Sequence, residues 1–166
     1  MREYSIPALA DIPAAANLAD VVTRREAEQP RTVALRRKGA NGTWEDVTTS
    51  QFADEVHALA KGLIAAGIAA GDRVAIMSHT SYEWTLIDYA VWTAGAIVVP
   101  IYETSSAEQA EWILSDSAAR VVIAETDAFE NMINGARDRL PALEHLWRIR
   151  PGLSDLVASE IGRAHV

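Results

Sequence analysis

The sequence predicts an α/β fold, in which helices flank both faces of a mainly parallel sheet and an N-terminal β-hairpin precedes it. Two observations support this fold class. Short apolar runs alternate with helical patterns four times between residues 73 and 149, and parallel strands need such crossover connections. Before them, two β-prone runs flank a turn rich in glycine and asparagine, which is typical of a hairpin.

The composition is that of an ordinary folded domain. The chain has 166 residues, of which 49% are hydrophobic and 23% charged, and a chain of this size can bury roughly 70% of its unfolded surface. Against 23 Asp and Glu stand 15 Lys and Arg, a net charge of −8, so no nucleic acid is expected as a partner. Because cysteine, a signal peptide and a membrane-spanning apolar run are absent from the sequence, we expect a cytoplasmic protein.

Three elements are expected in the first 50 residues. Residues 1–19 combine two prolines with alanine-rich sequence and no sustained period, which indicates an extended arm. A short helix is expected over 18–28, because the proline that follows disfavours helix just before it. The hairpin strands are expected at 32–37 and 43–47, joined by the turn 39–42.

The remaining elements follow from hydrophobic periodicity. Phe52, Val56 and Leu59 recur at helical spacing, whereas the strands are apolar runs of the length that a buried strand needs. The strand 96–100 is expected to be buried inside the sheet and to end at Pro100, at the carboxyl edge. Helices are expected from Thr49 to a cap at Gly67, from Ser81 to Thr93 with a cap at Gly95, and over 106–115 and 127–139; strands are expected at 73–77, 96–100, 121–124 and 145–149.

No complete phosphate or metal site is evident. Gly62 and Gly67 have the spacing of the glycines in a P-loop, but Ile68 follows where lysine is required, so a helix and its cap are expected there. No Gly-x-Gly-x-x-Gly occurs in the sequence. The four histidines are widely separated along the sequence, which favours structural or surface roles over a shared metal site: His57, His79, His145 and His165.

The sequence also contains no pattern typical of paired catalytic carboxylates or of a serine nucleophile. The adjacent carboxylates of Glu45 and Asp46 should diverge, as should those of Asp54 and Glu55, so we expect solvated charges. The Gly-x-Ser-x-Gly elbow of serine hydrolases does not occur. No residue is therefore assigned as catalytic, cofactor-binding or metal-binding.

The helix expected after residue 81 carries three large aromatic residues. Trp84 and Trp92 share one face, and Tyr89 is expected to lie elsewhere. Packing in the core or against a neighbouring domain explains these side chains better than a ligand site does. Function therefore needs another argument.

Residues 92–106 read W-T-A-G-A-I-V-V-P-I-Y-E-T-S-S. This stretch resembles the early conserved block of adenylate-forming, AMP-binding enzymes, in which an A-G-A-x-x-V-P turn joins a helix to a strand. Thr43 and Trp44, with residues 48–52, resemble the family's short strand and following helix, and 71–76 resembles its G-D-x-V-A strand. Residues 81–84 and the P-x-Y-x-T-S-S motif are most similar to the corresponding sequences of long-chain fatty acyl-CoA ligases of actinobacterial type.

The resemblance covers roughly residues 15–157 and implies a two-step reaction. A carboxylate attacks the α-phosphate of ATP to give an acyl-adenylate and pyrophosphate, and the thiol of coenzyme A then displaces AMP. The complete enzyme would use ATP, Mg²⁺ and coenzyme A and act on a fatty acid.

The family's catalytic elements belong to segments downstream of those matched here: the phosphate loop with its Lys, the Thr-Glu pair associated with Mg²⁺, the ribose-binding Asp, the hinge and the C-terminal Lys. The chain is therefore expected to be an inactive N-terminal fragment that binds none of these cofactors tightly. Its expected partner is the missing downstream part of its own chain. Peripheral membrane contact and a homodimer stay open.

The last seven residues, 160–166, depart from the family. They read E-I-G-R-A-H-V, which the string GAGATCGGAAGAGCACACGTC would encode, and that string resembles an adapter used in short-read sequencing. We expect residues 1–159 to be a partial N-terminal domain and 160–166 to be a non-native tail. A natural loop is the alternative.

Two other functions stay open. Another adenylate-forming enzyme, such as an aryl-CoA ligase or an amino-acid-activating module, would share the motifs at 71–72 and 94–95. Such an enzyme usually lacks the sequence motif found here at 102–106. A free-standing α/β binding module of flavodoxin type would need a phosphate loop after its first strand, and the sequence contains none.

Overall fold

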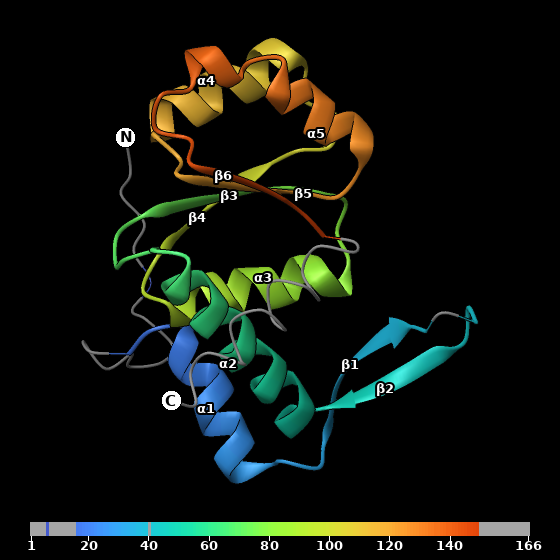
Figure 1. The fold of residues 1–166 in the computed structure, drawn as a ribbon. Helices are drawn as coiled ribbons and strands as arrows, with labels where there is room; N and C mark the ends of the chain where they lie inside the picture. The colour runs from blue at the N-terminus through green and yellow to red at the C-terminus, as the bar shows by residue number, and fades with distance from the viewer. Residues whose placement is uncertain (1–5, 7–15, 40, 150–166) are drawn as a thin grey trace.

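The computed structural model describes residues 6, 16–39 and 41–149. Within this part of the chain, four parallel strands form a sheet in the order β4-β3-β5-β6. Figure 1 shows α2 and α3 on one side of the sheet and α4 and α5 on the other, so the predicted α/β class is confirmed. Most of the expected arm 1–19 and all of the expected tail 160–166 lie outside the described residues.

Most elements begin and end close to where the sequence predicts. Hydroxyl groups of the residues before α2, α3, α4 and α5 accept a hydrogen bond from the first helical turn and define these helix starts. The helices are α1 (Ala19–Glu28), α2 (Thr49–Ala65), α3 (Tyr82–Thr93), α4 (Ala107–Ser117) and α5 (Asp127–Asn134), followed by the 3₁₀ turn η1 (Arg137–Arg139). The strands are β1 (Val33–Lys38), β2 (Trp44–Thr48), β3 (Arg73–Met77), β4 (Ile97–Ile101), β5 (Val121–Ala124) and β6 (His145–Arg148).

The core has one cluster on each face of the sheet, and a third cluster of Val22, Val47, Phe52, Ala53 and Val56 lies between the hairpin, α1 and α2. Val74 and Ile76 of β3 pack with α2 and α3, while Ala75 and Met77 pack with α4 and α5. Successive strand residues point to opposite faces, and helices cover both. This explains why β3 is apolar at almost every position rather than at every second one.

One expectation about the sheet is wrong in the part of the chain that is described: β4 is an edge strand, and Ile97 is 51% exposed. The backbone N–H of Ile97 donates to the carbonyl of Asp72 at 2.7 Å, on the β3 side, so Val98 and Pro100 present their backbone outward. The strand also continues past Pro100 to Ile101. Because proline has no N–H, Pro100 removes a donor from the exposed edge.

The expected helix over 127–139 is interrupted. The α-helix ends at Asn134, and a separate 3₁₀ turn covers Arg137–Arg139. The break turns the chain so that Ala136, Leu140 and Leu143 enter the core above the sheet. Burial of these apolar side chains decides the path more than helix propensity does.

Two side-chain expectations also change. Tyr89 does not lie apart from Trp92, because their rings meet edge to face with centroids 5.2 Å apart, as residues three apart on a helix can. Glu55 is not simply solvated: it accepts hydrogen bonds from Arg37 at 2.9 Å and from the Tyr82 hydroxyl at 2.8 Å. The hairpin thus packs back onto α2 and α3.

Candidate functional site

Open α/β folds bind ligands at the carboxyl edge of the sheet, where the loops that leave the strands converge. In this chain Ser78 and His79 follow β3, Tyr102 follows β4 and Glu125 follows β5. Because β4, β3 and β5 are neighbours in the sheet, these side chains belong to one edge. This edge is the candidate functional site.

His79 and Glu125 are directly paired at this edge. The imidazole Nδ1 lies 2.8 Å from Glu125 Oε2, and the backbone N–H of His79 donates to the same oxygen at 2.8 Å. The Ser78 hydroxyl donates to the carbonyl of His79 at 2.8 Å. Glu125 therefore orients the ring through Nδ1 and leaves Nε2 as the ring's second polar atom.

The pairing shifts the pKa values of both groups. The hydrogen bond to Glu125 raises the pKa of His79; burial acts in the opposite direction, and the charges of Glu125 and Glu103 raise the pKa further. Burial acts to raise the pKa of Glu125, but hydrogen bonds from the backbone and ring of His79 outweigh it and lower that pKa. An imidazole held in this way can accept or donate a proton at Nε2, or bind an anionic oxygen when it is protonated.

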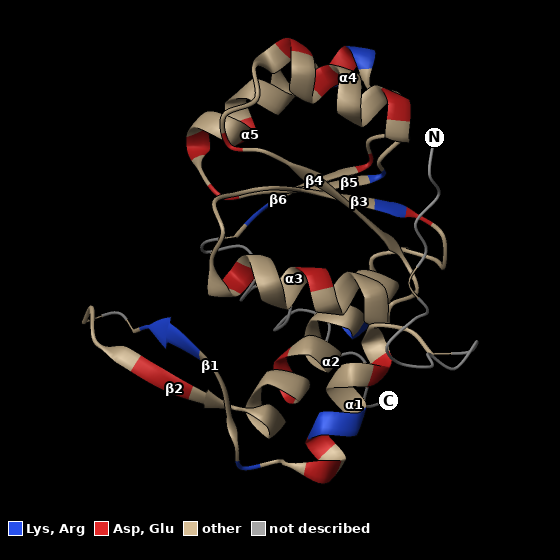
Figure 2. Cartoon of the chain, turned by 180° about the vertical axis from the view of Figure 1, so that it is seen from behind, with Lys and Arg blue, Asp and Glu red and all other residues tan. Residues whose placement is uncertain are grey.

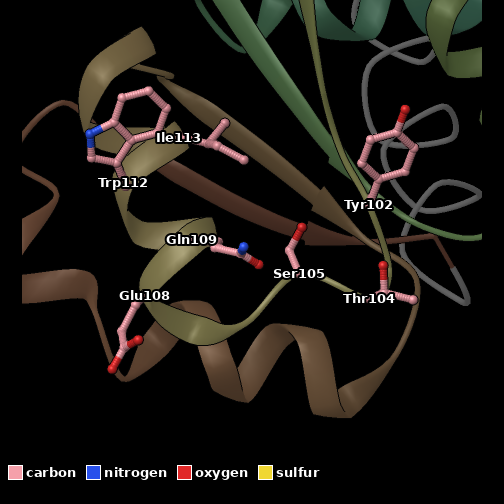
Figure 3. Close-up of a pocket in the computed structure, with 7 residues that line it drawn as sticks. All are labelled: Tyr102, Thr104, Ser105, Glu108, Gln109, Trp112 and Ile113. Carbon is pink, nitrogen blue, oxygen red and sulfur yellow. The ribbon is translucent and has the colours of Figure 1, made fainter.

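Beside this edge, a hollow of about 580 Å³ lies between the loop after β4 and helix α4. Figure 3 shows Tyr102 and Trp112 at its two ends, with Ser105 and Gln109 between them. Gln109 accepts a hydrogen bond from the backbone of Ser106 at 2.9 Å as part of the helix cap, so its carbonyl oxygen is already used. The hollow thus offers mainly two exposed aromatic rings.

The described residues of this edge do not by themselves offer the positive charge that binding a nucleoside triphosphate needs. Glu103 and Glu125 bring negative charge there, and Arg148 at the end of β6 pairs with Asp127 and, at 3.3 Å, with Glu130. Bound phosphates need free cations or converging backbone N–H groups. Nor do the described residues contain a group of three or more His, Asp or Glu side chains placed to hold a metal ion.

The pairing of His79 with Glu125 is not predicted from the sequence. Both residues follow an apolar strand, and that signal is visible in the sequence. The adjacency of β3 and β5 is not visible there. Of the other histidines, His145 stacks on Trp147 with ring centroids 5.1 Å apart, which fits the expected structural role, and His165 lies outside the described residues.

The motif at residues 71–72 lies at the opposite, amino edge of the sheet. Gly71 has a φ of +83°, which favours glycine. Asp72 accepts a hydrogen bond from the backbone of Ala69 at 2.8 Å and pairs with Arg120. The motif therefore has a structural role here, away from the carboxyl edge.

None of the described helices is both long and apolar enough to cross a membrane. Acidic and basic residues are spread over the helices and the hairpin (Figure 2).

The comparisons with known proteins agree on one family. The family model of AMP-binding enzymes matches residues 22–157. Over 149 residues the chain is 44% identical to the long-chain-fatty-acid–CoA ligase FadD15 of Mycobacterium bovis, an alignment that covers 90% of this chain and 25% of that relative.

Two solved structures extend the likeness to the fold. The crystal structure of the anthranilate CoA ligase AuaEII in complex with anthranoyl-AMP has a TM-score of 0.79 and 26% identity, covering 90% of this chain and 28% of that one. The structure of a Mycobacterium tuberculosis fatty acyl CoA synthetase has a TM-score of 0.75 and 28% identity, covering 87% and 28%.

The chain spans about a quarter of the length of the curated relative FadD15. The match runs through the α/β core and through the block at residues 92–106, in which Gly95 joins α3 to β4. The family model covers most of the chain, and the resemblance seen in the sequence is confirmed. The chain belongs to the family of AMP-binding, adenylate-forming enzymes and is close to the long-chain fatty acid–CoA ligases.

Proposed function

We propose that the chain is the N-terminal part of an ATP-dependent, AMP-forming long-chain fatty acid–CoA ligase of the cytoplasm. The 44% identity to FadD15 over 149 residues carries this proposal. In the complete enzyme a fatty acid carboxylate would displace pyrophosphate from ATP, and the thiol of coenzyme A would then displace AMP from the acyl-adenylate. Mg²⁺ would neutralise phosphate charge during the first step.

The chain by itself is proposed to be inactive. Its described residues at the carboxyl edge bring acidic groups and one arginine, Arg148, that is already paired with carboxylates, and these do not neutralise a triphosphate. In the complete enzyme this chain would supply the sheet β4-β3-β5-β6 with its flanking helices. It would also supply the carboxyl edge of that sheet, where His79 and Glu125 lie. The downstream part of the same chain would supply the phosphate loop, the magnesium ligands and the catalytic lysine.

Residues 160–166 are proposed to be a non-native tail encoded by an adapter. The match to the family model ends at residue 157. This supports a change from native to adapter-encoded sequence close to residue 159. Reading the genomic frame beyond codon 159 tests this. A frame that continues into a Ser/Thr/Gly-rich loop ending in Lys is expected, whereas a genomic frame that itself encodes residues 160–166 would contradict the proposal.

The activity is tested with two proteins, the 166-residue chain and the complete enzyme read from that genomic frame. Each is incubated with palmitate, ATP, Mg²⁺ and coenzyme A, and pyrophosphate is followed. We expect turnover from the complete enzyme and none from the short chain above a heat-denatured control. Turnover by the short chain would overturn the proposed inactivity.

A second set of substrates separates the acyl-chain class from an aryl-CoA ligase. The TM-score of 0.79 to an anthranilate CoA ligase makes this comparison necessary. The complete enzyme should prefer palmitate to anthranilate and benzoate. A preference for the aromatic acids would overturn the assignment to long-chain fatty acids while leaving the family unchanged.

A further inference from the structure

A second hollow, of about 420 Å³, opens where α1, β1, α2 and α3 meet. Figure 1 shows that this region lies on the side of α3 away from the sheet, so it is separate from the carboxyl edge. Its volume is within the range of roughly 300–1,000 Å³ that is usual for small-molecule sites. We call it the α1 groove.

The α1 groove has an apolar interior. Val22 and Phe52, which line it, are only 5% and 7% exposed. The ring of Phe52 meets that of Tyr89 edge to face with centroids 5.6 Å apart, and Val33 lines the groove with 46% of its surface exposed. Val22 and Phe52 form the closed floor of the groove, and an aliphatic chain laid over it would remove exposed apolar surface of Val33 and of the half-buried Tyr89 from water.

One cation, Arg25 in the last turn of α1, lines the same groove. Within the described ranges its side chain has no hydrogen bond or ion pair, unlike Arg37 of the hairpin, which pairs with Glu55 at 2.9 Å. The hydroxyls of Thr49 and Thr85, which also line the groove, donate to backbone carbonyls at 3.1 and 3.2 Å. Arg25 is therefore the polar group that remains for a ligand.

We propose that the α1 groove, which lies apart from the carboxyl edge of the sheet, binds an aliphatic carboxylate, that is, a fatty acid. The acyl chain lies against Val33 and Tyr89, over the floor formed by Phe52, and the carboxylate pairs with Arg25. A guanidinium group matches the two oxygens of a carboxylate in a bidentate pair. The proposal does not rest on the proposed function, because binding here requires neither ATP nor the downstream part of the chain.

The test is photoaffinity labelling of the 166-residue chain with dodecanoic acid that carries a terminal diazirine, with the labelled peptides mapped by mass spectrometry. We expect saturable labelling within residues 21–35, 49–52 and 85–89. Unlabelled dodecanoate should compete for the site, and dodecanol, which lacks the charge, should compete less well. Labelling can be done at low protein concentration, where association between copies of the chain does not interfere with ligand binding.

Arg24 provides the matched control, because it neighbours Arg25 in sequence but does not line the groove. Arg25→Gln should reduce labelling about threefold to fivefold, the size of an exposed ion pair, and Arg24→Gln should leave it unchanged. Ala34→Trp, which places an indole in the groove, should abolish labelling while circular dichroism shows the wild-type fold.

Several outcomes would overturn the proposal. These are the absence of saturable labelling, labelling in other segments, equal losses in the Arg24→Gln and Arg25→Gln chains, and wild-type labelling of a folded Ala34→Trp chain. Ligase turnover is not part of the readout. An inactive complete enzyme would therefore count against the proposed function alone, and an unlabelled chain against the α1 groove alone.

Discussion

Arg120 donates two parallel hydrogen bonds to the carboxylate of Glu144, from Nε to Oε1 at 2.8 Å and from Nη2 to Oε2 at 2.6 Å. The same guanidinium pairs with Asp72 and donates to the carbonyl of Gly67 at 3.0 Å. Asp72, Arg120 and Glu144 each precede a strand, namely β3, β5 and β6. One side chain thus joins the amino ends of three neighbouring strands.

Asp72→Ala should lower the free energy of unfolding by about 1–2 kcal/mol, because it removes the acceptor of the Ala69 N–H and one partner of Arg120. Urea denaturation measures the change. The matched control is Asp46→Ala, which removes only the exposed partner of Arg36 and should change stability by less than about 0.5 kcal/mol. Equal losses would show that the interactions of Asp72 with Arg120 and with the Ala69 N–H contribute nothing beyond an ordinary surface pair.

Ala118→Gly should stabilise the protein by about 0.5–1 kcal/mol. Ala118 ends α4 with a φ of +49°, in the left-handed region where a Cβ is unfavourable. Arg73 holds this turn by donating to the carbonyls of Ser117 at 2.7 Å and Ala118 at 3.0 Å. The control Ala58→Gly, inside α2, should cost about 1 kcal/mol, so chemical denaturation should give changes of opposite sign.

Gly95→Val should destabilise the protein strongly, and Gly135→Ala should not. Gly95 has a φ of +76°, and a Cβ there would lie 3.2 Å from that of Ala70, so strain of about 1–2 kcal/mol adds to an overpacking cost of about 1–3 kcal/mol. At Gly135 the nearest atoms are 3.5 Å away, and alanine should be neutral or stabilising. Equal soluble yield and equal denaturation midpoints for the two variants would contradict this prediction.

Glu125→Gln should cost more stability near pH 6 than near pH 9. The raised pKa of His79 means that the folded state favours the protonated ring. The contribution of the pair is therefore present below the ordinary histidine pKa of about 6.5 and is lost as the pH rises through the raised value. NMR titration of the His79 ring should show a lower pKa in Glu125→Gln and no change in the control Glu130→Gln. An unchanged His79 pKa in Glu125→Gln would refute the pairing.

The 166-residue chain should self-associate. Ile97 and Trp112 expose 51% and 66% of their surface, and such apolar side chains promote association. In sedimentation velocity, Trp112→Arg should shift the chain toward monomer, and Pro100→Val, which restores an outward N–H on β4, should increase association. A monomeric wild-type chain that melts cooperatively would contradict the prediction.

The sequence alone determined the local elements and the family. The runs at 73–77 and 121–124 are predicted with the bounds that the structure has, because strands covered on both faces are apolar throughout and end at polar residues. Ser81 and Ser106 mark helix starts through their side chains, a property of neighbouring residues only. That no residue of this chain is catalytic, cofactor-binding or metal-binding stays a prediction.

Only the tertiary structure decided which elements are neighbours. His79 and Glu125 are 46 residues apart and meet because β3 lies beside β5. The same strand order makes β4 an edge, contrary to expectation, and burial of Leu140 and Leu143 ends α5 early. Strand order depends on how the helices pack on the two faces of the sheet, and the periodicity of a single segment carries no information about that packing.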